Sequence, residues 1–287
     1  MKVLVTGANG FIGRHAVKAL KEAGHEAITL DQEWYRAMDI AADITKPLSP
    51  IPGLDAVIHL AAMASPKECD GSPSRAFDVN VHGTHEVLKM ALKSGAKKVV
   101  FASSAHVYDI PPMYFPTDEL HPLRLNNTYT TTKLLGEELC RLYFENHGLS
   151  YTALRFYNVY GPGQALGYFV PDMIMKAKSG SIELPGGNTT KDFVYVGDVA
   201  QAIMLAMKTS FVGAINIGTG VESNLALIAG RIAESLGVSF STTPIATATR
   251  MQADSSRAQT VLGWKATTDV TTGLERIFQY KGIKVVA

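Results

Sequence analysis

Two side chains able to work together in proton transfer lie four residues apart, at Tyr129 and Lys133. In a helix this spacing places both on one face, one turn apart, so both can contact the same ligand. An ammonium about 5 Å from a phenol favours the phenolate by roughly 3 kcal/mol at an effective dielectric of about 20, or about two pKa units. The pair therefore predicts a tyrosine that acts as a general base.

A serine pair lies upstream of these residues, at the end of a predicted buried strand over residues 97–103. Open parallel sheets bind ligands at the carboxyl ends of their strands, so Ser103 and Ser104 are expected at the site. Ser104 is then placed to hold the reacting hydroxyl in line with Tyr129.

Three glycines, Gly7, Gly10 and Gly13, directly follow an apolar, β-branched run over residues 2–6. Gly7 permits a tight turn out of the strand, Gly10 lets the backbone approach a pyrophosphate, and Gly13 lets the next helix lie close to the sheet. That helix, predicted over residues 11–23, points its first N–H groups at the phosphates. The stretch predicts a dinucleotide site, and a tight turn without ligand is the alternative.

The next predicted strand ends in Asp31, at the distance from the glycines that suits a carboxylate binding the adenosine ribose hydroxyls. A carboxylate there repels the extra phosphate of NADP, and Gln32 and Glu33 supply no base to hold one. NAD is therefore the predicted cofactor.

In this order the glycines, Asp31, Ser104, Tyr129 and Lys133 resemble the extended branch of the short-chain dehydrogenase/reductase superfamily. The resemblance implies that Ser104, Tyr129 and Lys133 are catalytic and that Lys133 also holds the nicotinamide ribose. It further implies that Asp43-Ile44 cups the adenine, although two ordinary loop residues are the alternative. The predicted cofactor-binding residues are Gly7, Asn9, Gly10, Phe11, Ile12, Gly13, Asp31, Asp43, Ile44, Leu60, Ala61, Ala62, Asn80, Tyr129, Lys133 and Phe156.

Length and composition indicate a globular protein. The 287 residues suffice for one large α/β unit with a smaller lobe, and 46% hydrophobic with 18% charged residues argues against disorder. A net charge of +1 provides no overall electrostatic attraction for nucleic acid or acidic membranes. There is no membrane-length apolar run or signal-peptide core, and Cys69 and Cys140 show no metal or redox spacing. We expect a cytoplasmic protein with reduced thiols.

The alternation of strands and helices indicates a Rossmann-like doubly wound parallel sheet with a smaller, discontinuous C-terminal lobe. Strands are expected at 25–30, 55–62, 150–156 and 214–217, and helices at 81–94, 129–146 and 171–178. Asn80, Asp198 and Ser223 are expected to precede or cap helices. The NAD-binding domain is assigned to residues 1–162, with 192–222 returning to it, and the substrate lobe to 163–191 and 223–287.

Three histidines raise the question of a metal site. His59 lies inside an apolar strand, where a hydrogen-bonded core histidine is the more common outcome. His82 and His85 are three residues apart on a predicted helix, but no carboxylate or thiol pattern completes a set of ligands. No metal is predicted.

Five further motifs narrow the resemblance to the NAD-dependent nucleotide-sugar epimerase/dehydratase family, in particular to enzymes similar to UDP-glucose 4-epimerase. They occupy residues 103–108, 154–162, 191–198, 216–220 and 262–264. The resemblance implies a nucleoside-diphosphate sugar substrate, with Asn158 at the diphosphate and Lys191 and Arg250 near it. The predicted substrate-binding residues are Ser104, Tyr129, Asn158, Lys191 and Arg250.

Three departures from the family pattern bear on the reaction. Lys191 occupies a position where arginine is usual. The two-point hydrogen bonding of a guanidinium to phosphate is then replaced by the single charge of an ammonium. The segment between Gly163 and Lys191 is shorter than in most members. The 4,6-dehydratases usually carry Thr-Asp-Glu where this chain has Ser104-Ala105-His106, which argues against dehydration.

The favoured reaction is C4 epimerisation through a 4-keto sugar, with Tyr129 taking the hydroxyl proton. The alternatives are a 4-keto-sugar reductase or another dehydrogenase or dehydratase of the family. A non-enzymatic NAD-sensing module is expected to lose Tyr129 or Lys133, and both are present. The resemblance also implies a homodimer through a four-helix interface that partly buries Leu135, Leu139 and Leu142.

Overall fold

A seven-stranded sheet forms the centre of the computed structural model, which describes residues 1–32, 38–108 and 111–283. All of its strand pairs are parallel, in the order β10-β6-β5-β4-β1-β2-β3. The order reverses beside β1, which creates the crevice where doubly wound sheets bind ligands. The strands are β1 Lys2–Thr6, β2 Glu26–Asp31, β3 Ile40–Ala41, β4 Ala56–His59, β5 Lys98–Ser104, β6 Ser150–Phe156 and β10 Gly213–Ile217.

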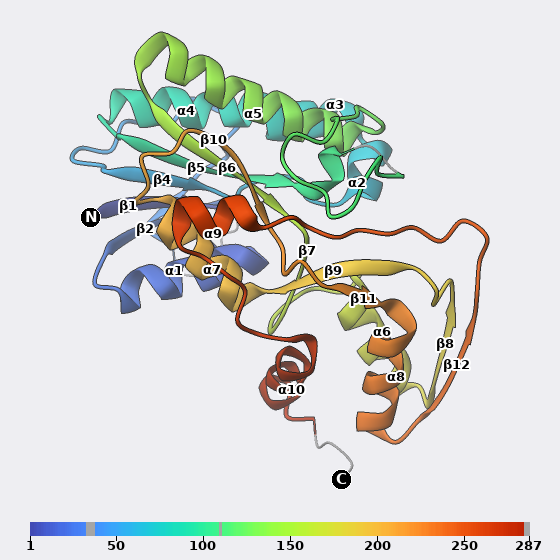
Figure 1. Ribbon diagram of the computed structural model, residues 1–287. Coiled ribbons are helices and arrows are strands. Elements are labelled where there is room, and N and C mark those ends of the chain that lie inside the picture. The colour runs from blue at the N-terminus through green and yellow to red at the C-terminus, as the bar shows by residue number, and fades with distance from the viewer. Residues whose placement is uncertain (33–37, 109–110, 284–287) are drawn as a thin grey trace.

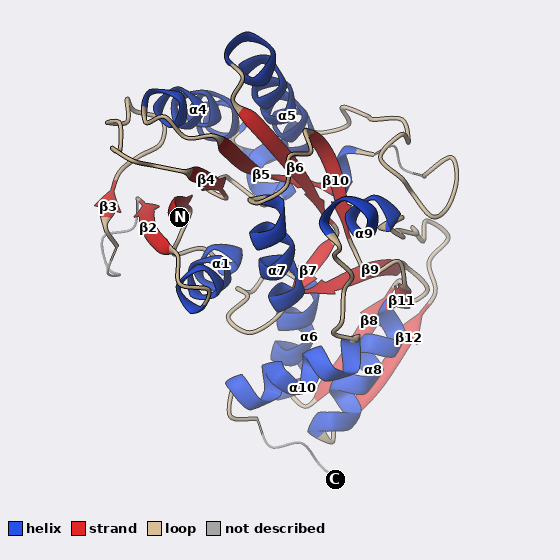
Figure 2. Cartoon of the chain, turned by 60° about the vertical axis from the view of Figure 1, so that its left-hand side comes forward, coloured by secondary structure: helices blue, strands red, loops and turns tan. Residues whose placement is uncertain are grey.

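Helices cover both faces of this sheet, as the two views of the chain show (Figures 1 and 2). On one face lie α1 Phe11–Glu22, α7 Val196–Ala206 and α9 Ser256–Leu262, and on the other α4 Gly83–Lys93 and α5 Thr128–His147. Each face has its own apolar core, as parallel strands buried on both sides require. The predicted doubly wound fold is confirmed.

A smaller lobe lies beyond the carboxyl ends of the strands (Figure 1). It holds a three-stranded sheet in the order β11-β9-β7 and the parallel pair β12-β8, with an apolar core of its own. Its strands are β7 Asn158–Tyr160, β8 Ser181–Pro185, β9 Thr190–Tyr195, β11 Glu222–Asn224 and β12 Ser239–Thr243, and its helices α6 Phe169–Lys178, α8 Leu225–Leu236 and α10 Val270–Tyr280. The chain enters and leaves this lobe more than once, because α7 and β10 return to the large sheet.

The three expected helix starts were wrong. Asn80 lies inside a π-helical turn, Asp78–His82, which follows α2 Pro66–Gly71 and α3 Pro73–Phe77 and leads into α4. Asp198 lies in the first turn of α7, and its carboxylate accepts hydrogen bonds from Thr268 N (3.0 Å) and the Thr267 hydroxyl (2.8 Å). Ser223 belongs to β11, and Asn224 caps α8. In each case long-range packing decided where the helix began.

His59 is a hydrogen-bonded core histidine, as expected. Its Nδ1 lies 2.7 Å from the Thr6 hydroxyl and its Nε2 lies 3.0 Å from the Thr84 hydroxyl. Burial, with a smaller effect from the Lys133 charge, lowers the pKa of His59 to about 3. The imidazole is therefore neutral in the folded protein at physiological pH.

This neutral histidine predicts a loss of stability in acid. Between pH 6.5 and about 3 the unfolded chain binds a proton at His59 that the folded chain does not. In this range His59 therefore lowers the free energy of unfolding by about 1.4 kcal/mol for each unit by which the pH is lowered. Urea unfolding at pH 6 and pH 4.5 should show a smaller decrease for His59→Gln than for the wild type. Equal decreases would contradict the assignment.

Within the described residues no helix is long and apolar enough to cross a membrane.

Candidate active site

The glycine loop has the close backbone approaches that the sequence predicts. Gly7 has a φ of +67°, and a Cβ there would lie 2.7 Å from the Ala61 nitrogen on the neighbouring β4 connection. A Cβ at Gly13 would overlap the Gly7 carbonyl oxygen, and one at Gly10 would lie 3.0 Å from that oxygen. The loop therefore leaves bare backbone at the start of α1, which fits a dinucleotide pyrophosphate.

Asp31 ends β2 at the same edge of the sheet. Its Oδ2 accepts a hydrogen bond from Asn9 N (2.9 Å) and its Oδ1 accepts one from Gln32 N (2.8 Å). These bonds orient the carboxylate and leave lone pairs for ribose hydroxyls. Asn9, which was predicted to bind the cofactor, does not line the cavity described below and contacts Asp31 instead. Glu33, part of the argument against NADP, lies outside the described residues.

A cavity of about 660 Å³ joins the glycine loop to the carboxyl ends of β4, β5 and β6. Most of the predicted cofactor and substrate residues line it together. They are Gly7, Gly10, Phe11, Ile12, Gly13, Asp31, Asp43, Ile44, Leu60, Ala61, Ala62, Ser104, Tyr129, Lys133, Phe156, Asn158 and Lys191.

Two predicted residues besides Asn9 do not line this cavity. Asn80 is buried behind the wall, where its amide bonds both the N–H and the carbonyl of Met63 and the Thr132 hydroxyl. It can thus shape the cavity through Met63, which does line it. Arg250 forms an ion pair with Glu222 (2.5 Å) and lies over the ring of Phe115, with its side chain about half exposed. Arg250 therefore does not line the cavity, although its chain neighbours Thr249 and Met251 contact Lys191 Nζ. Its place near the diphosphate stays a prediction.

Ser104, Tyr129 and Lys133 meet where β5 ends against α5. All three are buried, and Lys133 Nζ donates a hydrogen bond to Ala102 O (2.8 Å) and lies 5.8 Å from the centre of the Tyr129 ring. Asn127 and Thr130 form a capping box across the first turn of the 20-residue helix α5, and this box fixes the start of the helix around Tyr129.

The structure corrects one electrostatic expectation. Burial raises the pKa of Tyr129 to about 12, opposed by a hydrogen bond with the Ser104 side chain, and burial lowers the pKa of Lys133 to about 8. The predicted fall in the tyrosine pKa is therefore wrong for the protein alone, because desolvation of the buried phenol has the largest effect.

Lys191 supplies a positive charge to the cavity. Its Nζ contacts the Thr249 hydroxyl (3.4 Å) and Met251 Sδ (3.2 Å), both weak partners for an ammonium, and burial lowers its pKa. Asn158 lies beside it on β7 and donates to Asp192 O (3.1 Å). An ammonium without a carboxylate partner among the described residues suits an anionic ligand such as a diphosphate.

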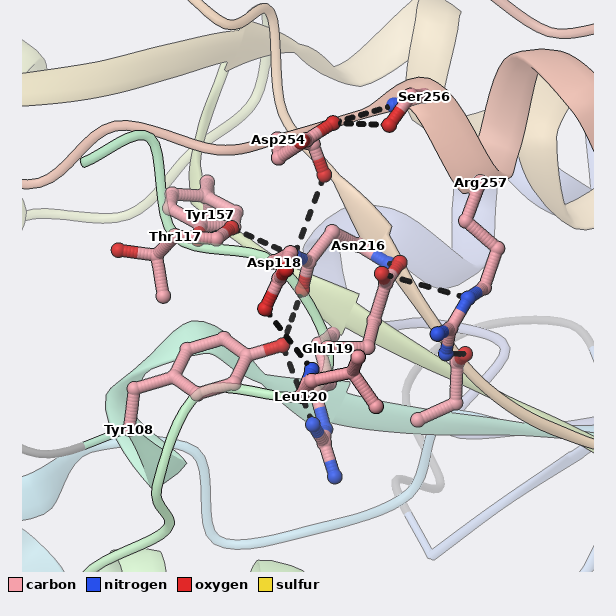
Figure 3. Close-up of polar contacts among 12 residues, drawn as sticks. Tyr108, Thr117, Asp118, Glu119, Leu120, Tyr157, Asn216, Asp254, Ser256 and Arg257 are labelled. Carbon is pink, nitrogen blue, oxygen red and sulfur yellow. Dashed lines mark hydrogen bonds and ion pairs between the residues drawn. The ribbon is translucent and has the colours of Figure 1, made fainter. Parts of the chain in front are cut away.

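A buried polar network supports the wall around this site (Figure 3). The Asn216 side chain accepts a hydrogen bond from the Tyr108 hydroxyl (2.5 Å) and donates to the carbonyls of Thr117 and Asp254, joining β10 to two loops. Arg155 continues the network from Tyr108 (3.1 Å) to a two-point ion pair with Glu137, one turn after Lys133 on α5. The network thereby ties α5 to β6, to β10 and to the loops that carry Thr117 and Asp254.

Several cavity residues were missed by the sequence analysis. They include Met63, Arg75, His106, Gln164 and Tyr168. His106 had a signal, since it follows Ser104 by two residues, whereas Arg75 and Tyr168 are brought in by tertiary packing alone. The rings of His82, at the end of the π-helical turn, and His85, on α4, stack with centres 6.4 Å apart, and the described residues contain no group of three or more potential metal ligands.

A parallel sheet with a glycine loop at one strand end, and serine, tyrosine and lysine at the next ends, defines a dinucleotide-dependent enzyme of the short-chain dehydrogenase/reductase type. Residues 3–218 match the model of the NAD-dependent epimerase/dehydratase family. The chain belongs to this family, whose cofactor is the predicted NAD.

The names of the relatives described here all refer to nucleotide sugars, but the reactions that they name differ. A putative UDP-glucose 4-epimerase of Methanocaldococcus jannaschii is 32% identical over 302 residues, covering 97% of both chains. UDP-glucuronic acid decarboxylase 6 of Arabidopsis thaliana is 29% identical, covering 96% of this chain and 87% of its own. The structure of MoeE5 in complex with UDP-glucuronic acid and NAD superposes with a TM-score of 0.88 at 29% identity, covering 98% of this chain and 99% of its own.

Proposed function

We propose that this protein is an NAD-dependent nucleotide-sugar epimerase that inverts C4 of a nucleoside-diphosphate hexose through a transient 4-keto sugar. One observation supports it above the others. A single cavity is lined by the glycine loop and Asp31, by Ser104, Tyr129 and Lys133, and by Asn158 and Lys191.

The residues that line the cavity fit NAD, and each group of them has a separate task. The glycine loop holds the pyrophosphate, Asp31 the adenosine ribose, Asp43-Ile44 the adenine, and Lys133 the nicotinamide ribose. NAD⁺, when bound, supplies a reversible two-electron acceptor and the positive ring that favours the Tyr129 phenolate.

The chain's own residues handle the proton and the substrate. Ser104 holds the C4 hydroxyl, and the Tyr129 oxygen removes its proton as the hydroxyl becomes a ketone. Asn158 and Lys191 hold the diphosphate while the keto sugar turns over. Tyr129 then returns the proton to the oxygen of the inverted alcohol.

A 4-keto-sugar reductase is the second candidate, because it needs the same three catalytic residues once per turnover. Dehydration is less favoured, since Ala105 and His106 replace the acidic pair of the dehydratases. Denaturing the purified protein and identifying the released nicotinamide, then following nucleotide sugars by NMR without added cofactor, tests the proposal. Conversion without added cofactor supports the epimerase.

Asp31 should determine the preference between NAD and NADP. Asp31→Ala should weaken NAD binding by roughly tenfold, the effect of losing hydrogen bonds to a charged group, while easing discrimination against NADP. Glu26→Ala, at the exposed start of the same strand, is the matched control. Tighter binding of NADP than NAD by the wild type in calorimetry would overturn the assignment.

We also propose a homodimer formed by α4 and α5. These helices pack together on the outer face of the sheet, and Leu142 leaves 42% of its surface exposed there, with Leu135 also exposed. Light scattering at micromolar concentration should give twice 30.9 kDa. Leu142→Glu should yield monomers, whereas the same change at Leu227, an exposed residue of α8, should not. A monomeric wild type would refute the interface.

A cytoplasmic location remains our expectation, in keeping with Cys69 and Cys140 both being free thiols.

A further inference from the structure

Glu137 is a buried carboxylate one helical turn after Lys133 on α5, with 8% of its surface exposed. Its Oε1 accepts hydrogen bonds from Ser103 Oγ (2.5 Å) and Arg155 Nε (3.0 Å), and its Oε2 accepts one from Arg155 Nη2 (2.7 Å). The carboxylate therefore joins α5 to β5 and β6, within one turn of Lys133 and one residue of Ser104. The proton transfers of the proposed reaction do not use it.

The bond from Ser103 bears on the position of the catalytic serine. Ser103 and Ser104 are the last two residues of β5, and both are buried. The residue before them, Ala102, accepts the hydrogen bond of Lys133 Nζ (2.8 Å). Two consecutive residues of β5 are thus held by side chains of α5, immediately before Ser104. This double attachment fixes the serine on β5 relative to the tyrosine and lysine on α5.

Glu137 is also the anion that faces Lys133. Burial lowers the pKa of Lys133 to about 8, and negative charge at Cys69 or Glu137 opposes this effect. Burial raises the pKa of the Cys69 thiol, so this thiol on α2 is uncharged at physiological pH. The carboxylate of Glu137 is then the group that opposes the loss of the Lys133 charge.

The other titratable groups that face Lys133 among the described residues are not anions. His59, on β4, is neutral because burial lowers its pKa to about 3, and β5 contributes uncharged serines. Tyr129 is a neutral phenol in the protein alone, since burial raises its pKa to about 12. Arg155, on β6, is a cation paired with Glu137, and it offsets part of the effect of the carboxylate.

We propose that Glu137 positions the active site in two ways. Through Ser103 it holds Ser104 against α5, and its negative charge keeps Lys133 an ammonium. The inference rests on the proposed function, in which this ammonium lies beside Tyr129 and the nicotinamide ribose. Glu137 acts through its neighbours, because it is not among the described residues that line the cavity. The tether and the charge can be removed separately.

Glu137→Gln tests the charge, because the amide oxygen can still accept the bond from Ser103. Without the negative charge Lys133 should lose its proton at lower pH. With lysine side chains labelled, the NMR titration midpoint of Lys133, identified by its loss in Lys133→Met, should fall by about one pH unit. This is the order expected for charges one helical turn apart at an effective dielectric of about 20, with Arg155 offsetting part.

The pH profile of the reaction gives a second readout of the charge. The alkaline limb of kcat/KM for UDP-glucose should move to lower pH in Glu137→Gln by the same amount as the Lys133 midpoint. Glu138→Gln is the matched control, because Glu138 is the next residue of α5 and pairs with Arg141 at the surface (2.8 Å). It should shift neither the limb nor the midpoint.

Ser103→Ala tests the tether, because it keeps the ion pair between Glu137 and Arg155. It should lower kcat by roughly 10–100-fold, as a small misplacement of Ser104 does, and leave the Lys133 midpoint unchanged. If Glu137→Gln does not fold because Arg155 is left unpaired, Glu137→Leu combined with Arg155→Met replaces the ion pair by apolar side chains, which buried pairs often tolerate. The Lys133 midpoint should fall in this double variant too, by a smaller amount.

The outcomes separate this inference from the proposed reaction. An unchanged Lys133 midpoint in Glu137→Gln or in the double variant, an equal fall in Glu138→Gln, or wild-type kcat in Ser103→Ala would overturn the inference. The midpoint requires no turnover. A fall in Glu137→Gln, with no conversion of any nucleotide sugar by the wild type, would instead refute the proposed reaction and leave the charge role of Glu137 supported.

Discussion

Tyr129→Phe is expected to lower kcat by several powers of ten and to leave nucleotide-sugar binding nearly intact. The substitution deletes only the phenol oxygen, which takes and returns the proton in the transition state, and general acid–base catalysis of this kind contributes about 10²–10⁴-fold. Asn158 and Lys191 still hold the diphosphate, so the Kd for the substrate should change little. Stopped-flow rates and calorimetry measure the two effects separately.

Tyr280→Phe provides the matched control, because Tyr280 is 65% exposed and lies outside the cavity. It should retain wild-type kcat. If Tyr129→Phe lost substrate affinity in proportion to activity, Tyr129 would be a binding residue and the general base would have to be sought elsewhere.

Gly13→Ala is expected to abolish NAD binding and to destabilise the fold by about 3 kcal/mol or more, as overpacking against fixed backbone does. The added methyl would overlap the Gly7 carbonyl oxygen, which is backbone and cannot rotate away. The loop or the start of α1 must therefore move, and the pyrophosphate contacts depend on both. Thermal unfolding with and without NAD measures the change.

Gly24→Ala separates this effect from a general cost of losing a glycine. Gly24 ends the same helix with a φ of +74°, and a Cβ there meets nothing within 4 Å. It should cost only about 1–2 kcal/mol through backbone strain and leave NAD affinity unchanged. Equal losses of NAD affinity in the two variants would show that the glycine loop does not form the pyrophosphate site.

Local features of the fold and site were predictable because their causes are local in sequence. The glycine spacing, the alternation of strands and helices, and the Tyr129–Lys133 spacing each arise within a few residues. Parallel strands then bring their carboxyl ends to one edge, which carried Asp31 and Ser104 to the same cavity.

Features set by tertiary packing were not predictable. Arg250 pairs with Glu222, 28 residues away, and Asn80 fixes Met63 from inside a π-helical turn. The pKa of Tyr129 also depends on how completely the rest of the chain buries it, which helical spacing cannot reveal. In each case the deciding neighbour lies on another element.

The most direct test of the central claim follows a deuterium at C4 of the nucleotide sugar. If the protein is an epimerase, the two C4 epimers interconvert, the deuterium stays on the sugar, and nicotinamide absorbance shows no net change over many turnovers. Stoichiometric consumption of NADH with a 4-keto sugar, and no interconversion of any C4 epimer pair, would contradict this claim and identify a reductase.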